Sequence, residues 1–327
     1  MKVAFLVTRP EKPSARYRVV QFLPYLRERG MHPEILRIPR DRRRRRRLFE
    51  TLGSYDVVVI QKKLFRRSNL KRLRRAARKL AYDFDDAVMF NVKGGEERRK
   101  AAKFARVCEA ADVVICGNGY LRELASRHTE KTVGLPTSLD TDLFVPAGDG
   151  GGGEKVVLGW IGSHSTLKYL IDIMSAFEIL AKSHPETVLS VICDTFPEEC
   201  PLPVERRVWS GETEIADLQG VDIGLMPLRY DPWSRGKCGF KILQYFAVGK
   251  PVVCSPVGVN REIVEDGVNG FWARGPEEWA EKIGALIDDA NMRRDFGARG
   301  REKVVRDYSL KSTAPKLEKI LRDLETK

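Results

Sequence analysis

The sequence has no long apolar run. Its hydrophobic stretches, such as Val57–Ile60, end after a few residues, whereas a membrane-spanning helix needs about 20. The apolar residues Val3–Val7 are too few for the core of a secretion signal and are followed at once by Arg9 and Pro10. We therefore expect a cytoplasmic chain that is neither exported nor inserted into a membrane.

Disulfide and metal-binding patterns are also missing. The six cysteines are scattered without any C-x-x-C pair, and the 327 residues include four histidines. Such spacing argues against a disulfide framework and against a zinc site. We expect reduced, mostly buried cysteines, and neither a metal nor another cofactor.

Negative charge is scarce in the first half of the chain. Residues 1–150 contain 34 Lys and Arg against 18 Asp and Glu, a net charge of +16, while the remainder contains 24 against 27, a net charge of −3. The densest basic stretches are Arg42–Arg47 and the segment from Arg66 to Lys79. Apolar residues recur at helical spacing in the second stretch, which predicts an amphipathic helix with a cationic outer face. They are Leu70, Leu73, Ala77 and Leu80.

A basic surface attracts polyanions. Three interpretations stay open for the two basic stretches: a solvated helix face plus an arginine-rich loop, an anionic membrane surface, and nucleic acid. The aromatic residues that single-strand binders place among their basic residues are missing here, which disfavours nucleic acid. The anionic inner face of the cell membrane is therefore a candidate partner of the N-terminal half.

Short apolar runs alternate with helical stretches along the whole chain, a pattern that predicts an α/β fold with parallel strands. A glycine-rich stretch at 148–153 interrupts the pattern as a flexible linker does. Strands are expected before it at Lys2–Val7, Pro33–Ile38, Val57–Ile60, Leu80–Phe84 and Val113–Cys116. Those expected after it are Val156–Ile161, Val188–Cys193, Ile223–Met226 and Val252–Cys254.

The linker indicates two Rossmann-like domains. We expect one domain over residues 1–147 and the other over 154–309, with the last helix, within 310–327, packing back on the first. Ligands of such domains collect at the carboxyl ends of the strands, and we expect the two sheets to face a shared cleft.

Two loops of the second half are typical of phosphate binding. The first, from Gly162 to Thr166, joins an expected strand to a helix, so its backbone N–H groups and hydroxyls suit a phosphate. Ser163 and Thr166 are equally typical of ordinary helix caps. The second loop contains Lys237 and Lys241, which are four residues apart and are therefore expected on one helical face. Two lysines at the start of a helix form a site suited to a diphosphate. Two ordinary lysines on an exposed helix are the alternative.

Five further segments complete the pattern: Asp83–Val88, Ala111–Leu121, Leu135–Pro146, Ala247–Val253 and Gly258–Gly270. In their order and spacing, these segments and the two loops resemble family 4 glycosyltransferases with the GT-B fold, over nearly the whole chain. The resemblance implies two Rossmann-like domains, with the nucleotide-sugar donor bound in the second. It also implies a retaining, metal-independent transfer to a glycan or lipid-linked acceptor, as in cell-envelope glycan synthesis.

The resemblance implies a set of donor-binding residues. Negative charge develops on the leaving diphosphate during glycosyl transfer, and preorganised cations there lower the barrier. We expect this role for Lys237 and Lys241, and we expect Lys241 to be catalytic. The other expected donor-binding residues are Gly162, Ser163, His164, Thr166, Lys168, Arg235 and Gln244.

One family motif is altered in this sequence. The family has two glutamates eight positions apart, one near the sugar and one at the donor ribose, and these positions correspond to Gly236 and Gln244. A glutamine still forms hydrogen bonds with a ribose hydroxyl, but it brings no charge.

The first half supplies candidates for the acceptor side. Arg16 and Arg18 follow the first strand and are expected to bind donor phosphate or an anionic acceptor, with Asn118 at the floor of the cleft. Asp85 and Asp86 are candidate catalytic bases, because neighbouring carboxylates raise one another's pKa. Capping of the following helix is the alternative role.

The sequence thus predicts a hexosyltransferase-type glycosyltransferase. Two alternatives stay open. A catalytically silent GT-B scaffold that binds nucleotide is suggested by the two altered motif positions, and a polyanion-binding α/β protein by the basic half.

Overall fold

The computed structural model of the protein describes residues 1–91, 95, 97–148 and 155–326. The chain forms two compact units. The first comprises Met1–Asp140, Asp231–Cys238 and Tyr308–Lys327, and the second comprises Thr141–Tyr230 and Gly239–Asp307. The segment Asp231–Cys238 thus belongs to the first unit, although it lies within the stretch that the sequence pattern assigns to the second domain. Most of the expected linker falls at 149–154, outside the described residues.

The first unit is built on a parallel six-stranded sheet with the order β2-β1-β3-β4-β5-β6. Its strands are β1 (Lys2–Val7), β2 (His32–Arg37), β3 (Val57–Gln61), β4 (Lys79–Phe84), β5 (Val113–Cys116) and β6 (Thr132–Gly134). Its helices are α1 (Pro13–Arg18), α2 (Leu23–Glu28), α3 (Arg42–Glu50), α4 (Arg67–Ala76), α5 (Arg98–Ala110), α6 (Gly119–Ser126), α10 (Pro232–Arg235) and α15 (Leu310–Thr326). Short 3-10 turns lie at Val20–Phe22 and Leu52–Ser54.

The second unit has its own parallel six-stranded sheet, with the order β12-β11-β10-β7-β8-β9. Its strands are β7 (Val157–Ile161), β8 (Val188–Cys193), β9 (Val204–Val208), β10 (Ile223–Met226), β11 (Val252–Cys254) and β12 (Gly270–Trp272). Its helices are α7 (His164–Ile171), α8 (Met174–Ser183), α9 (Glu214–Gln219), α11 (Phe240–Ala247), α12 (Asn260–Ile263), α13 (Pro276–Asp288) and α14 (Ala290–Lys303), followed by a π-helical turn at Val304–Tyr308. The expected α/β fold with two parallel sheets is confirmed.

Strand β3 shows why these apolar runs form central strands. Its side chains alternate between two separate cores: Val58 and Ile60 pack on one face of the sheet, and Val57 and Val59 on the other. A strand buried on both faces has no polar side to turn toward water, so its sequence is continuously apolar. The same reasoning applies to β5, β8, β10 and β11, whose bounds equal the expected ones.

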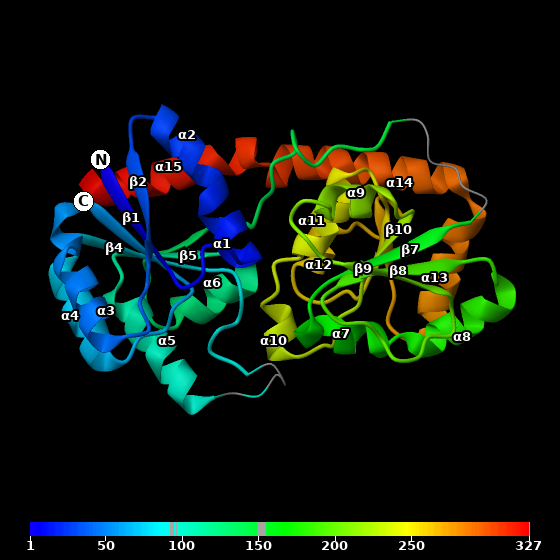
Figure 1. The fold of residues 1–327 in the computed structure, drawn as a ribbon, viewed down its shortest axis with the longest axis horizontal. Coiled ribbons are helices and arrows are strands. Elements are labelled where there is room, and N and C mark those ends of the chain that lie inside the picture. The colour runs from blue at the N-terminus through cyan, green and yellow to red at the C-terminus, as the bar shows by residue number, and fades with distance from the viewer. Residues whose placement is uncertain (92–94, 96, 149–154, 327) are drawn as a thin grey trace. The chain divides into compact units, whose positions relative to one another are not determined.

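The C-terminal helix α15 contributes to the core of the first unit. Leu317, Leu321 and Leu324 are buried in the same cluster as Val57 and Val59, and α15 lies beside α2 (Figure 1). Burying one leucine side chain contributes roughly 1.5–3 kcal/mol to the free energy of unfolding. The core on this face of the sheet therefore depends on α15, which follows β3 by about 250 residues.

The basic stretches fold differently from the sequence-based interpretation. Residues Arg42–Arg47 belong to helix α3, not to a loop: the Asp41 side chain accepts a hydrogen bond from the Arg44 N–H (2.8 Å), and Phe49 is buried. Helix α4 ends at Ala76, and Leu80 lies in β4. The apolar residues at helical spacing therefore extend beyond the end of the helix, which is shorter than the spacing predicts. Among the helices of the described residues, none has both the length and the apolar character needed to cross a membrane.

Candidate functional site

Arg18 and Asp83 form a buried ion pair in the first unit. The guanidinium donates hydrogen bonds to both carboxylate oxygens and to the Leu135 carbonyl (2.7 Å), and both side chains are almost fully buried. Burial raises the pKa of Asp83, and Arg18 opposes that shift. The structure therefore pairs Arg18 with a buried carboxylate of the protein, whereas the sequence predicts that Arg18 binds donor phosphate or an anionic acceptor.

Asp85 and Asp86 follow β4 and lie against lysines. Lys62 contacts both carboxylates, with 3.2 Å between its Nζ and Asp85 Oδ1, and Lys237 Nζ lies 2.9 Å from Asp86 Oδ1. Burial acts to raise the pKa of Asp86, but Lys237 and Lys62 outweigh it, so the pKa lies well below its ordinary value. The expectation that neighbouring carboxylates raise the pKa of Asp86 is wrong, because two ammonium groups are closer partners.

Lys62 is a residue that the sequence reasoning missed. Its backbone is left-handed, with φ of +63°, a conformation that is uncommon outside glycine. Its N–H donates to the Asp83 carbonyl (2.7 Å), and the Ser14 hydroxyl lies 3.4 Å from its Nζ. Residues held in sparsely populated backbone regions cluster at functional sites. The signal in the sequence is its position directly after an apolar strand, since ligands bind at the carboxyl ends of parallel strands.

The segment Asp231–Cys238 binds to the first unit through backbone contacts. The Asn118 side chain donates to the carbonyls of Gly236 (3.3 Å) and Lys237 (3.0 Å) and also caps α6 by accepting from the Leu121 N–H (2.8 Å). The Cys238 thiol donates to the Asp85 carbonyl (3.2 Å), and burial raises its pKa to about 12. Asn118 therefore positions the loop that carries Lys237.

Two further arginines of the first unit lie over aromatic rings. The Arg235 guanidinium is 4.2 Å from the ring centre of Tyr120, at the start of α6. The Arg16 guanidinium is 5.1 Å from the ring centre of Tyr17, and its side chain is half-buried. Such stacking fixes the plane of a guanidinium.

In the second unit, the loop from Gly162 to Thr166 is packed tightly against Trp160. A Cβ added at Gly162 would lie 2.3 Å from the buried indole ring, so this position requires glycine. The Ser163 N–H donates to the Thr166 hydroxyl (3.1 Å), and the His164 N–H donates to Asp194 (2.8 Å). The helix-cap alternative therefore describes Ser163 and Thr166 in this structure.

Asp194 was also missed from the sequence. Its hydrogen bond from the His164 N–H lowers its pKa, and its Oδ2 lies 3.6 Å from the His164 ring nitrogen Nδ1. It follows β8 directly, and its partner lies 30 residues earlier in the chain.

Lys241 lies apart from Lys237 in secondary structure. Helix α11 begins at Phe240, after Gly239 with φ of +63°, and Lys237 precedes the helix in the first unit. The expectation that the two lysines share one helical face is therefore wrong. Lys241 Nζ lies 4.2 Å from the ring centre of Trp160, and Lys168 Nζ lies 4.9 Å from that of Tyr169.

Gln244 forms a hydrogen bond with a buried carboxylate. Glu214, the first residue of α9, accepts hydrogen bonds from Gln244 Nε2 (3.0 Å) and from the Trp209 indole N–H (3.1 Å). Both Glu214 and Gln244 are 3% exposed. The chain thus places a carboxylate next to the position where the resembled family has its ribose-binding glutamate. Sequence reasoning missed Glu214 because it lies 30 residues away from Gln244.

The structure distributes the candidate residues over the two units. The first contains Arg16, Arg18, Asp85, Asp86, Asn118, Arg235 and Lys237, and the second contains Gly162, Ser163, His164, Thr166, Lys168, Lys241 and Gln244. Across the part of the chain that the structure describes, no three His, Cys, Asp or Glu side chains gather as metal ligands do.

The known proteins that this chain resembles are glycosyltransferases. Residues 155–289 match the family described as glycosyl transferases group 1. A Bacillus subtilis protein named "Putative teichuronic acid biosynthesis glycosyltransferase TuaH" is 29% identical over 199 residues, covering 53% of this chain and 49% of that protein. The D-inositol 3-phosphate glycosyltransferase of Corynebacterium urealyticum is 24% identical over 261 residues, covering 74% and 56%. The chain spans about half the length of these two relatives.

Solved structures match over the whole chain. Sucrose-phosphate synthase from Thermosynechococcus elongatus has a TM-score of 0.77 at 15% identity, covering 99% of each chain. The Anabaena protein Alr3699/HepE, in complex with UDP and glucose, has a TM-score of 0.75 at 16% identity, covering 99% of this chain and 100% of that one. The two parallel sheets are those of the GT-B fold, as the sequence predicts.

Proposed function

We propose that the chain is a glycosyltransferase that moves a hexose-type sugar from a nucleotide-diphosphate sugar to a glycan or lipid-linked acceptor. The match of residues 155–289 to glycosyl transferases group 1 carries this proposal, because that stretch contains the Gly162 loop, Lys241 and Gln244. The Anabaena structural neighbour is described in complexes with UDP and with UDP-glucose. A nucleotide-diphosphate sugar is therefore the donor class that we assign to the second unit.

Lys241 is the cation that we assign to the leaving diphosphate. It lies in the first turn of α11, and its Nζ is 4.2 Å from the Trp160 ring, which is part of β7. The Tyr245 hydroxyl bridges the two elements by accepting from the Ile161 N–H (3.0 Å) and donating to the Gly159 carbonyl (2.9 Å). A cation fixed in this way stabilises charge on the diphosphate without reorganising during the reaction. On the same grounds we propose a reaction that needs no metal or other cofactor. We propose that it is retaining because the sequence resembles a retaining family.

We assign Gln244 and Glu214 to the donor ribose. Gln244 offers an amide oxygen and nitrogen to the sugar hydroxyls, while Glu214 fixes the orientation of the amide through its Nε2. The carboxylate also carries the negative charge that the family's glutamate would supply. Glu214 is thus a positioning residue in this assignment.

The two carboxylates of the first unit receive different roles. Asp86 contacts two lysines, which lower its pKa and keep the carboxylate ionised. We therefore assign Asp86 to positioning Lys237. Asp85 contacts Lys62, and the Ser14 hydroxyl lies 3.3 Å from its carboxylate. We assign the acceptor base to Asp85.

We also propose that the protein associates with an anionic membrane surface through α3 and α4. The apolar residues Leu70 and Leu73 of α4 are buried, so its arginines and lysines form the outer face. Each basic residue near an anionic surface contributes about 1 kcal/mol to binding. If neutralising Arg42–Arg47 leaves binding to anionic vesicles unaltered, this part of the proposal fails. An acceptor of the cell envelope agrees with the name of the Bacillus relative.

The experiment that tests the proposal is a thermal-shift panel of UDP-, GDP- and ADP-sugars, each with and without magnesium. A ligand that binds the folded protein stabilises it by a few kcal/mol at about 100 times its Kd. We expect a shift with one nucleotide and no dependence on magnesium. The absence of any shift would contradict the donor assignment.

A silent nucleotide-binding scaffold is the second candidate, because Gly236 and Gln244 stand where the resembled family has glutamates. It predicts a thermal shift without release of nucleotide diphosphate when envelope glycans are added. A polyanion-binding protein predicts salt-sensitive retention on DNA and no shift with any nucleotide sugar.

A further inference from the structure

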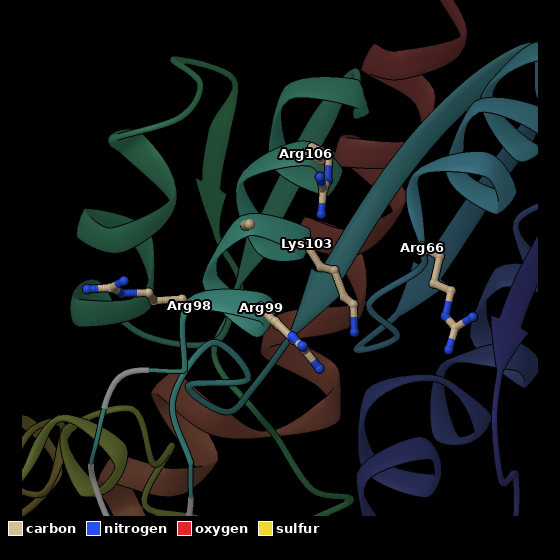
Figure 2. Close-up of a pocket in the computed structure, with 6 residues that line it drawn as sticks. Arg66, Arg98, Arg99, Lys103 and Arg106 are labelled. Atoms are coloured by element: carbon tan, nitrogen blue, oxygen red, sulfur yellow. The ribbon is translucent and has the colours of Figure 1, made fainter.

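A pocket of about 430 Å³ in the first unit is lined almost entirely by basic side chains (Figure 2). In Figure 2, Arg99 and Lys103 extend from α5 toward the side of Arg66, whereas Arg98 points away from it. The lining residues are Arg66, which precedes α4, and Arg98, Arg99, Ala102, Lys103 and Arg106 of α5. The pocket therefore lies between the start of α4 and one side of α5.

No carboxylate balances these cations within the described part of the chain. None of the five basic side chains forms an ion pair there, and the Nε of Arg106 is buried without a hydrogen-bond partner. A buried donor left unsatisfied costs about 1–3 kcal/mol, and more when it is charged. The pocket therefore contains a donor that a bound anion can pair with.

The uncompensated charge extends to neighbouring residues. Partial burial lowers the pKa of Lys63, and Arg45 and Lys103 lower it further. The Nε of Arg45 is likewise buried without a partner. Neighbouring positive charges lower the pKa of an ammonium group because they repel it. An anion that binds among these cations reduces the repulsion.

The position of the pocket in the unit suits a substrate. Arg66 lies in the connection that follows β3, and α5 lies in the connection that follows β4. Lys62, Asp85 and Asp86 belong to the same two connections. In parallel α/β sheets, ligands bind outside the carboxyl ends of the strands.

We propose that this pocket binds a phosphate or diphosphate group of the acceptor. The inference rests on the proposed function and narrows the acceptor to a phosphorylated one. A guanidinium presents paired N–H groups that match two phosphate oxygens, and lysine adds a point charge. The volume is in the range of small-molecule sites and admits a diphosphate with part of the group attached to it. A soluble phosphorylated glycan and a phospholipid headgroup share this chemistry.

The test is a calorimetric titration of inorganic pyrophosphate into the full chain, with excess UDP present to occupy the donor site. The variant Arg99→Ala/Lys103→Ala removes two cations from the pocket. The control Arg27→Ala/Lys316→Ala removes two exposed cations from α2 and α15, which belong neither to the pocket nor to the basic faces of α3 and α4. We expect the pocket variant to raise the Kd for pyrophosphate at least about tenfold, because hydrogen bonds to charged groups are the strong ones. The control should change it by less than about twofold. Arg66→Ala tests the opposite wall independently and should weaken binding in the same direction.

Vesicles of phosphatidylcholine with and without phosphatidic acid distinguish the two sources of the phosphate. Weaker binding of the pocket variant to the phosphatidic acid vesicles identifies a lipid headgroup. Unchanged vesicle binding with weakened pyrophosphate binding identifies a soluble phosphorylated acceptor.

Pyrophosphate binding that is absent from the wild type, or equal in the wild type and both pocket variants, overturns the proposal. Binding of UDP is measured in the same proteins. If UDP fails to bind while pyrophosphate binding still depends on Arg99 and Lys103, the donor assignment fails and the anion pocket stands.

Discussion

Gly236 lies directly against Ala87. A Cβ added at position 236 would be 2.5 Å from the Ala87 Cβ and 2.9 Å from its backbone nitrogen. Neither atom belongs to a flexible side chain, so the backbone would have to move. The position at which the resembled family has a glutamate is therefore closed to any side chain here, and the charge at this place comes from Lys237 and Asp86 instead.

We expect Gly236→Ala to lower the free energy of unfolding by about 1–3 kcal/mol, the usual cost of overpacking. Gly119→Ala is the matched control, because a Cβ there would have nothing within 4 Å and the residue begins helix α6. Differential scanning calorimetry of both variants measures the effect. Equal stability of Gly236→Ala and the wild type would show that the loop does not lie against Ala87.

Lys237→Met should flatten the acid dependence of stability. In the folded protein, the pKa of Asp86 lies below its ordinary value of 3.8. The ion pair of Asp86 and Lys237 therefore stabilises the protein above about pH 3.8, and this stabilisation is lost as the pH falls from there toward the folded-state pKa. Removing one of the two lysines brings the pKa back toward normal. Urea denaturation at about pH 7 and about pH 3 should therefore show a smaller loss of stability in the variant than in the wild type. Lys71→Met, an exposed lysine of α4, should behave like the wild type.

Lys241→Ala should lower turnover at least about tenfold with the fold intact, because the diphosphate loses a preorganised cation. Lys182→Ala on α8 removes an exposed lysine of the same unit and should leave turnover unchanged. Release of nucleotide diphosphate measures turnover, and circular dichroism checks the fold. Full turnover in Lys241→Ala would exclude this lysine from the diphosphate site.

Restoring the family's glutamate by Gln244→Glu should destabilise the protein. The new carboxylate would lie about 3 Å from that of Glu214, and two buried carboxylates at this distance cannot both be ionised. The pair's folded-state pKa would be raised, so the variant should be more stable near pH 4 and lose stability as the pH rises through about 4 to 7. Urea titrations across this range measure the effect.

The double variant Glu214→Gln/Gln244→Glu provides the control for that experiment, because it exchanges the carboxylate and the amide. Its stability at about pH 7 should exceed that of Gln244→Glu by at least about 1 kcal/mol. Equal stabilities would show that the two side chains do not interact.

Buried strands were the most predictable part of the structure. In β8, hydrophobic cores on both faces select apolar residues, so the bounds of the strand follow from the sequence alone. The sequence does not predict strand β9, because four of its five residues are exposed at the edge of the sheet and most of them are charged. Helix α3 is hard to predict because its six consecutive arginines show no apolar period, which is why a loop is one interpretation of this stretch. Asp41 at its start is a usable cap signal.

The candidate site was less predictable, because its partners come from distant segments. Lys237 and Lys241 look equivalent by spacing, but the left-handed Gly239 between them starts a new helix. Lys62, Asp194 and Glu214 acquire their partners through tertiary contacts with residues 24 to 30 positions away. A local sequence pattern cannot show which residues so far apart in the chain come into contact.

The last helix also bears on how the protein is synthesised. Leu317, Leu321 and Leu324 complete a core whose other residues come from the first strands of the chain. A ribosome releases those strands before the leucines that cover them, because α15 follows β3 by about 250 residues. One apolar face of the first sheet thus stays uncovered while the residues between β3 and α15 are translated, and a chaperone can bind there during that time.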